Sequence, residues 1–188
     1  MKSLAHRIRS FRDQEDGLVM TEFLIMLPLL VWTFMALFVY WDAFKTINQA
    51  QKAAYSVSDL ISRQNEIDNT FIQGMQSVTN YLMSDAPAVR MRITSIEYHE
   101  EDDEHVVLFS RSPGNKMPAM TNAMLAAKAD HIPLMADNDS VILVETSVDY
   151  QPGFDVGIPQ QAFDYFVVTR PRYYRRVCLD TNPCPDEL

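Results

Sequence analysis

The sequence lacks the common motifs of catalysis and metal binding. It has no glycine-rich phosphate loop, no nucleophile elbow and no His-Glu-x-x-His. Cysteine is scarce, and Cys178 and Cys184 form no zinc-ligand spacing with the histidines. We therefore predict no catalytic residue, no metal and no cofactor, and we expect a protein that is not an enzyme and has no small-molecule substrate.

Positive charge is also scarce beyond the N-terminus. The net charge is −9, and residues 1–17 hold four cations and three anions, so the rest of the chain carries −10. A nucleic-acid-binding domain needs a basic surface. This composition excludes that class, and we predict no nucleic-acid partner.

A long apolar segment lies close to the N-terminus. Thr33 is the only polar side chain between Phe23 and Trp41, and residues 18–20 extend the run to about the length that crosses a bilayer core. Aromatic residues at its distal end suit a membrane interface, and Pro28 is tolerated in membrane helices. The segment predicts a transmembrane helix over residues 18–41.

The flanks of this segment predict its orientation. Cations are concentrated before it and sparse after it, at Lys45 and Lys52. The positive-inside rule therefore places residues 1–17 in the cytoplasm and the acidic bulk outside. A cleaved secretory signal is the competing interpretation, but the run is long for one and Trp41-Asp42-Ala43-Phe44-Lys45 offers no clear cleavage site.

Glu22 does not fit a plain anchor. It lies within the apolar segment, about 6 Å along a helix from its start. One interpretation is that Glu22 marks the membrane boundary and that the span begins at Phe23. The other is that Glu22 meets a charged partner when helices assemble side by side, because an unpaired carboxylate in hydrocarbon is costly.

The residues around Glu22 carry a family resemblance. A short basic leader ends in Gly17, Leu18-Val19-Met20-Thr21-Glu22-Phe23 follows, and Leu27-Pro28-Leu29-Leu30 lies further on. The glycine, the glutamate at the fifth position after it and the apolar helix resemble the class III signal of type IV pilins and pseudopilins. The stretch is most similar to TadE-like (TadE/TadG) pseudopilins of the tight-adherence, or Flp, pilus system.

This resemblance implies a processing site and an assembly site. A prepilin peptidase would cut between Gly17 and Leu18, and Glu22, followed by Phe23, would pair with the N-terminal amine of a neighbouring subunit. The protein would be a minor pilin or pseudopilin that helps assemble a type IVc adhesion pilus. Its partners would be the membrane, other pilins and the inner-membrane Tad platform, and its C-terminal domain would lie in the periplasm. The alternative is a single-pass, membrane-anchored periplasmic binding or scaffold protein with no pilus role.

Residues 42–86 predict a helical extension of the membrane segment. Apolar residues recur there at helical spacing, with a break near residues 62–68 and a possible cap at Asn69-Thr70. The core-facing stripe of the first part is expected to include the following: Phe44, Ile47, Ala50, Ala54, Val57, Leu60 and Ile61.

Residues 87–188 predict a β-rich domain. Alternating residues predict strands at 89–98, 105–110, 141–150 and 163–169, with a bulge where the phase shifts at Ile96 and a short helix over Met117–Ala129. The predicted fold class is α+β, with the long amphipathic helix packed on a small antiparallel sheet as in pilins.

The remaining candidates lie in turns and in the tail. His99 and His105 flank an acidic run, Glu100–Glu104, that suits a solvated turn better than a cation site, and Asp137-Asn138-Asp139 lacks the other ligands of a calcium loop. The arginines and tyrosines of residues 170–176 indicate an edge strand or tail, or a surface for an acidic partner. In an oxidising periplasm, Cys178 and Cys184 are expected to form a disulfide that staples this tail.

Overall fold

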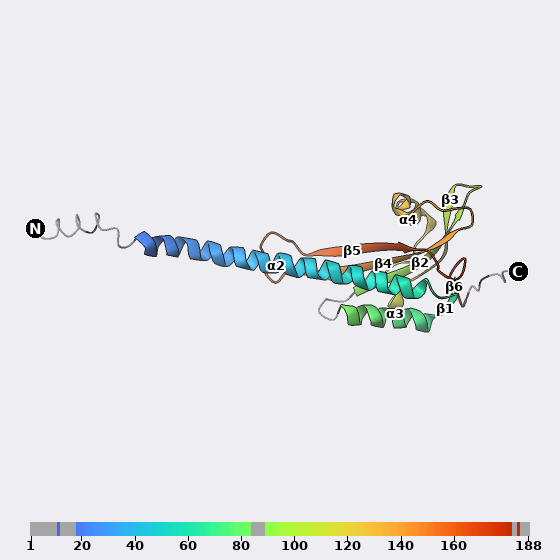
Figure 1. Cartoon of the computed structure of the whole chain (residues 1–188), viewed down its shortest axis with the longest axis horizontal. Helices are drawn as coiled ribbons and strands as arrows, with labels where there is room; N and C mark the ends of the chain where they lie inside the picture. The colour runs from blue at the N-terminus through green and yellow to red at the C-terminus, as the bar shows by residue number, and fades with distance from the viewer. Residues whose placement is uncertain (1–10, 12–17, 84–88, 182–183, 185–188) are drawn as a thin grey trace, which may run out of the picture. The chain divides into compact units, whose positions relative to one another are not determined.

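A computed structural model describes residues 11, 18–83, 89–181 and 184. These residues form an α+β fold with a long apolar helix near the N-terminus and a small antiparallel sheet (Figure 1). The chain divides into two compact units. The helix unit contains the chain through Asp42 together with the loop Pro152–Ile158, and the sheet unit contains residues 43–151 and 159–188.

Helix α2 runs from Leu18 to Ile61. Pro28 lies inside it and cannot donate a backbone hydrogen bond, yet the helix continues through this position. The hydroxyl of Thr33 donates to the carbonyl oxygen of Leu29 at 2.9 Å, so this polar side chain is satisfied by its own helix. The prediction of one helix through residues 18–41 and onward is confirmed.

Helix α3, Asn69–Leu82, follows the break predicted at residues 62–68. The carboxylate of Asp68 accepts a hydrogen bond from the backbone N–H of Phe71 at 2.6 Å, as an N-cap residue does. The cap is therefore Asp68, and the predicted Asn69-Thr70 cap is wrong by one residue. The break also holds the short strand β1, Glu66–Ile67.

Four antiparallel strands form the main sheet, in the order β3-β2-β4-β5. All four coincide with predicted strands to within two residues at each end. Their bounds are β2 Val89–His99, β3 Glu104–Arg111, β4 Ser140–Tyr150 and β5 Gln161–Thr169.

The phase shift of β2 has a different cause from the predicted one. The β2–β4 register runs unbroken from Val89 opposite Val148 to Glu97 opposite Ser140. The register breaks between β2 and β3 instead, where Ser95 pairs with Phe109 and Ile96 with Val107, so the extra residue belongs to β3. Apolar residues change phase in β2 because both faces of the sheet are covered.

The first face of the sheet packs against helices α2 and α3. Small residues of α2, Ala50 and Ala53, share a core cluster with Val89 and Val148, which lets the helix approach the sheet closely. Next to it, Val57 and Ile61 pack with α3 residues and with alternate residues of β2 and β4. The predicted stripe is partly wrong, because Phe44 and Leu60 are exposed.

The second face is covered by the segment between β3 and β4. Met120 and Leu125 pack there against Ile96, Val141 and Leu143. Helix α4 in this segment spans only Asn122–Ala126, and the 3-10 turns η1, Pro113–Asn115, and η2, Ala129–His131, lie on either side of it. The predicted helix over Met117–Ala129 is thus too long: Thr121 caps α4 by accepting from the N–H of Met124 at 3.3 Å. Figure 1 shows α3 and α4 on opposite sides of the sheet.

Candidate functional site

The surface of α2 up to Trp41 is apolar on all sides. Every side chain from Val19 to Phe34 is exposed to solvent, with Leu30 at 65% as an example. From Leu18 to Trp41 the helix rises about 36 Å, which exceeds the roughly 30 Å of a bilayer core. Among the described residues, α2 is the one helix long and apolar enough to cross a membrane. A helix that is apolar all round requires a non-aqueous neighbour, either lipid or other helices.

Glu22 is the only charged residue on this surface between Leu18 and Trp41. It is exposed in the first turns of α2, as is the neighbouring Phe23. Within the described residues Glu22 has no ion-pair partner. The carboxylate therefore lies exposed on an otherwise apolar part of the helix surface.

Only one of the two residues of the predicted processing site is among the described residues. Leu18 is the first residue of α2, whereas Gly17 lies outside the described residues. The basic leader before it lies outside them too, apart from Phe11. Cleavage after Gly17 therefore stays a prediction from the sequence.

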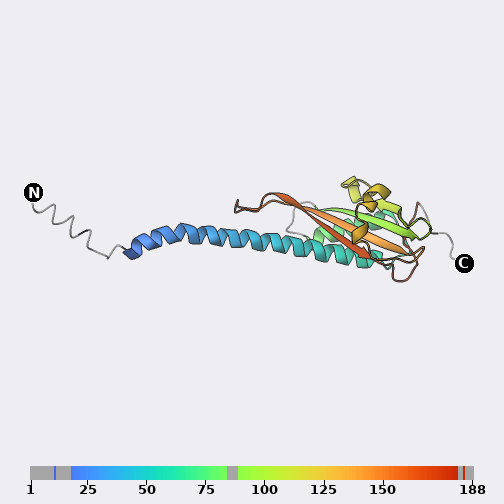
Figure 2. The ribbon, with the colours of Figure 1, turned by 90° about the horizontal axis from the view of Figure 1, so that it is seen from above.

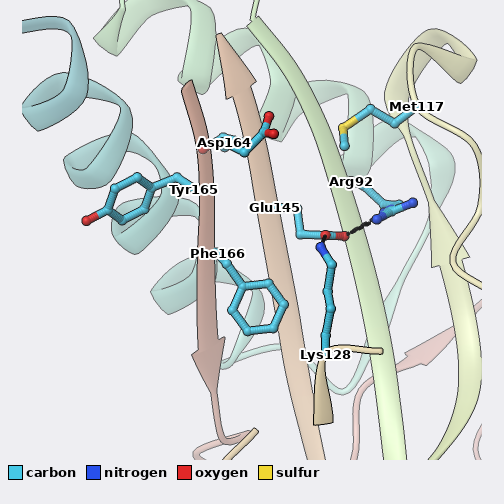
Figure 3. A pocket seen from close by; sticks show the side chains of 8 residues that line it. Arg92, Met117, Lys128, Glu145, Asp164, Tyr165 and Phe166 are labelled. Carbon is cyan, nitrogen blue, oxygen red and sulfur yellow. Dashed lines mark hydrogen bonds and ion pairs between the residues drawn. The ribbon is translucent and has the colours of Figure 1, made fainter. Parts of the chain in front are cut away.

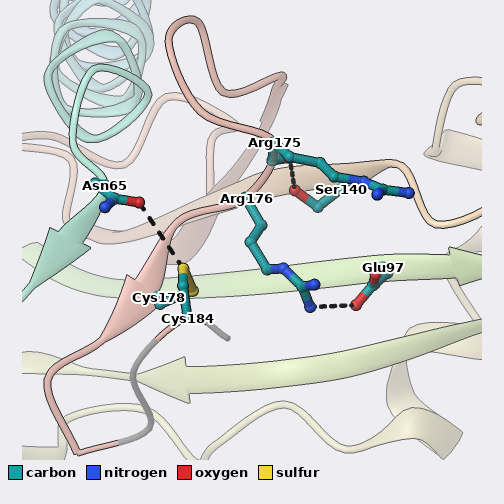
Figure 4. Close-up of a disulfide and its surroundings, with 7 residues drawn as sticks. All are labelled: Asn65, Glu97, Ser140, Arg175, Arg176, Cys178 and Cys184. Carbon is teal, nitrogen blue, oxygen red and sulfur yellow. Dashed lines mark hydrogen bonds and ion pairs between the residues drawn. A yellow bond between two sulfur atoms is a disulfide. The ribbon is translucent and has the colours of Figure 1, made fainter. Parts of the chain in front are cut away.

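Cys178 and Cys184 form a disulfide, with their Cα atoms 5.5 Å apart (Figure 4). Strand β6, Cys178–Leu179, lies parallel to β1, so the bridge closes next to the connection between α2 and α3. The Cys184 sulfur is 3.9 Å from Oδ1 of Asn65. A disulfide sulfur has no proton to donate, so this is a van der Waals contact. The predicted cysteine pair is confirmed.

The arginines of the tail pair with acidic groups of the same chain. Arg172 forms an ion pair with Asp59 of α2, and Arg176 donates to Glu97 of β2 at 3.2 Å. The hydroxyl of Ser140 donates to the carbonyl oxygen of Arg175 at 2.7 Å (Figure 4). These contacts hold the tail on the sheet unit. The acidic partner considered for this Arg/Tyr segment is therefore largely intramolecular.

Hydrogen bonds from side chains fix the acidic turn between β2 and β3. The hydroxyl of Tyr98 donates to Asp103 at 2.8 Å, and the N–H of Glu100 donates to Asp137 at 3.0 Å. The hydrogen bond to Asp103 raises the pKa of Tyr98, and desolvation and the charges of Asp103, Glu100 and Asp137 add to this rise. In the described part of the chain, no group of three or more acidic, histidine or cysteine side chains is placed to hold a metal ion.

Sequence reasoning missed an ion network on the second face of the sheet. Buried Arg92 of β2 lies 2.6 Å from buried Glu145 of β4, and Lys128 approaches the other carboxylate oxygen (Figure 3). Arg92 also donates to the carbonyl oxygen of Pro118 at 2.7 Å, and Lys128 lies 5.3 Å from the ring centre of Phe166. Arg92 and Glu145 lie opposite each other on β2 and β4, and no sequence signal showed that this face of the sheet would be covered.

A cavity of about 170 Å³ adjoins this network. Small-molecule pockets usually measure roughly 300–1,000 Å³. Glu145 is already neutralised from two sides, and Arg92 is bound to Glu145 and to a backbone carbonyl. We therefore assign the network a role in fixing the segment around Pro118 and Lys128 on the sheet.

Among the described residues, the exposed apolar half of α2 with Glu22 and Phe23 is therefore a candidate site for assembly or membrane contact. Comparison of the chain with protein families, curated proteins and solved structures found no match.

Proposed function

We propose that this chain is a TadE-like pseudopilin, a non-catalytic subunit that assists assembly of a Flp-type adhesion pilus. In this proposal residues 18–41 cross the inner membrane once, the N-terminus is cytoplasmic and the pilin-like sheet unit lies in the periplasm. Its partners are a prepilin peptidase, other pilins and the platform proteins of the Tad system.

The observation that carries the proposal is a lone carboxylate on an exposed apolar helix. A charged side chain at the centre of a bilayer costs about 2.5–3.5 kcal/mol, and less near the interface. A plain anchor gains nothing in return for this cost. A helix that packs against equivalent helices recovers it when Glu22 binds a cation supplied by a neighbour.

The chemistry of that cation follows from the proposed cut. Cleavage after Gly17 would create an ammonium group at Leu18, at the start of α2. Glu22 lies one turn along the helix, so its carboxylate can reach the ammonium of a neighbouring subunit that is shifted along the bundle axis. In hydrocarbon such a pair is specific, since each misaligned register leaves a charge unpaired.

The disulfide supports the proposed orientation. Disulfides persist in the periplasm and are rare in the cytoplasm. The Cys178–Cys184 bridge lies in the sheet unit, at the opposite end of the sequence from the basic leader. A periplasmic sheet unit and a cytoplasmic leader satisfy both the bridge and the positive-inside rule.

Intact mass and N-terminal sequencing of the protein from its own membrane test the processing step. We expect a mature chain that begins at Leu18. Gly17→Leu should leave the full leader in place, because the side chain blocks close approach of the peptidase, and Asp16→Asn should mature normally. An intact leader in cells with an active prepilin peptidase would contradict the proposal.

A second experiment separates the proposal from a scaffold with no pilus role. Glu22→Gln removes the charge and keeps the shape, so pilus assembly should be lost while membrane insertion persists. Thr33→Val is the matched control, because Thr33 is uncharged and its hydroxyl bonds to its own helix. If Glu22→Gln cells assemble pili at the normal level, the scaffold alternative is the better account.

A further inference from the structure

The loop between β4 and β5 has the composition of a membrane-contacting segment. Pro152–Ile158 reads Pro-Gly-Phe-Asp-Val-Gly-Ile, with Asp155 as its one charged residue. Phe154 is 45% exposed although it is large and apolar. Gly157 has a φ of +103°, a conformation that side-chain-bearing residues rarely adopt, so glycine is required for this turn.

This loop belongs to the helix unit, although 90 residues, 62–151, separate it from the end of α2 in the sequence. Figures 1 and 2 both draw it beside the helix. The exposure of individual side chains of α2 shows which turns of the helix the loop lies beside. Val39 is 1% exposed, whereas Phe38, Tyr40 and Trp41 remain exposed on the other sides of the same turn.

A helix standing alone cannot bury one side chain this completely. Met35 and Ala36, which share a face with Val39 at helical spacing, are also partly covered. The loop Pro152–Ile158 is the segment grouped with this part of the helix, and its Val156 is buried as well. The loop is therefore level with the last turns of the apolar segment.

The last turns of the apolar segment are also where its aromatic residues gather. Tyrosine and tryptophan at the end of a membrane span mark the level of the lipid headgroups. A loop at the same level meets the bilayer surface. If residues 18–41 span the membrane, as proposed above, the loop lies at the interface and its exposed apolar side chain faces lipid.

We propose that the loop Pro152–Ile158 is a second membrane contact, which inserts Phe154 into the boundary between headgroups and acyl chains beside α2. The inference rests on the proposed membrane anchoring. The occupant is the lipid surface itself, because the loop continues the apolar surface of the spanning helix. The loop has no cation, so the contact is apolar, forms on zwitterionic lipid and does not weaken with salt.

The experiment uses the full chain reconstituted into phosphatidylcholine vesicles. An environment-sensitive fluorophore is attached at Asp155→Cys, which keeps Phe154 intact; the native cysteines are bonded to each other and do not react. Spin-labelled lipids then quench the fluorophore at a shallow or a deep position. The matched control is Leu134→Cys, at an apolar residue that is 98% exposed and belongs to the sheet unit.

We expect the shallow quencher to remove about half of the emission and the deep quencher much less, since interfacial segments lie roughly 5–10 Å below the surface. Quenching should persist in high salt. Adding Phe154→Ser should reduce it to the level of the Leu134→Cys control.

Quenching of Trp32 and Trp41 reports on the anchor separately. If both tryptophans are quenched and the Asp155 probe behaves like the Leu134 control, the loop inference is wrong and the anchoring stands. If the tryptophans are not quenched, the anchoring itself fails. If quenching at Asp155→Cys disappears on dilution of the protein in lipid and the residue cross-links to its counterpart, a second copy covers the loop and the lipid contact is refuted.

Discussion

The two halves of α2 follow opposite rules for where apolar side chains lie. From Val19 to Phe34 they are mostly large and are exposed on all sides, and the only charged residue up to Trp41, Glu22, has no ion-pair partner among the described residues. From Ala43 to Ile61 the buried face is built from small and β-branched residues that pack on a sheet. The buried charged residues of the sheet unit, Arg92, Glu97 and Glu145, each have an ion-pair partner within it.

Under the proposed membrane anchoring, this contrast arises because one continuous helix lies in two solvents. The second half is amphipathic because water covers one side and the sheet covers the other. The first half is apolar all round, which in water would expose a very large hydrophobic surface. Substitutions that are tolerated in one half should therefore fail in the other, and the expected effects can be ranked.

The largest difference between the two halves of α2 is expected when an aspartate is introduced into each of them. Ala53→Asp buries an unpaired carboxylate at a position with no exposure and should destabilise the sheet unit by about 4 kcal/mol or more. Leu30→Asp should leave that stability unchanged and reduce membrane insertion. Urea unfolding in detergent micelles and vesicle flotation measure the two effects. Equal effects of both variants on unfolding would remove the distinction between the halves.

The next largest effect on the free energy of unfolding is expected when the ion pair between Arg92 and Glu145 is broken. Arg92→Met leaves Glu145 with only the partly exposed Lys128, and we expect a loss of about 3 kcal/mol in the free energy of unfolding. The double variant Arg92→Met/Glu145→Leu removes both charges and should recover most of this loss. Urea unfolding of both variants checks it. A double variant as unstable as the single one would show that packing of Arg92, and not its charge, matters.

The Arg92–Glu145 pair also marks the limit of sequence-based prediction for this chain. Val144 and Val148 alternate with Glu145 along β4, so period two predicts them on opposite faces, as the structure has them. The alternation did not show that Glu145 is buried, because burial depends on a segment placed twenty residues away in the sequence. Local patterns identify elements and faces, whereas the cover on a face is a long-range property.

The same reasoning explains the other successes and errors. The apolar run at residues 18–41 was readable because length and composition alone define it. The start of α4 was misplaced because Met117, Met120 and Met124 recur at helical spacing, although Thr121 is a capping residue. The parallel pairing of β6 with β1 was not predicted, since two-residue strands carry no periodicity. For the candidate site, Glu22 and Phe23 stay predictions from the sequence, whereas the proposed contact at Phe154 could not be predicted, because it depends on which part of α2 the loop lies beside.

Loss of the disulfide, which lies in the sheet unit, is expected to lower the free energy of unfolding by a smaller amount. Cys184→Ser opens a short loop, and chain-entropy arguments give a loss of about 2 kcal/mol. Reduction of the native protein should produce the same shift in the urea midpoint, and Thr181→Ser, in the same loop, should produce none. Vesicle flotation should be unaffected by all three. A change in flotation after reduction would mean that the tail also supports the helix unit.

The smallest effect concerns pH and lies at the β2–β3 turn. The hydrogen bond to Asp103 is the main cause of the raised pKa of Tyr98. A pKa that is higher in the folded chain favours the neutral phenol there. The associated stabilisation is fully present below the ordinary tyrosine pKa of about 10 and is lost as the pH rises through the raised value.

Asp103→Asn should therefore lower the pKa of Tyr98 towards its ordinary value, while Asp102→Asn, one residue away, should change it little. The difference in phenolate absorbance between each chain and its Tyr98→Phe variant isolates this tyrosine from the others. Because the turn lies in the sheet unit, membrane flotation should not follow this titration. If flotation falls as Tyr98 ionises, the turn interacts with the membrane surface. The distinction between the apolar half of α2 and the sheet unit would then not hold at this turn.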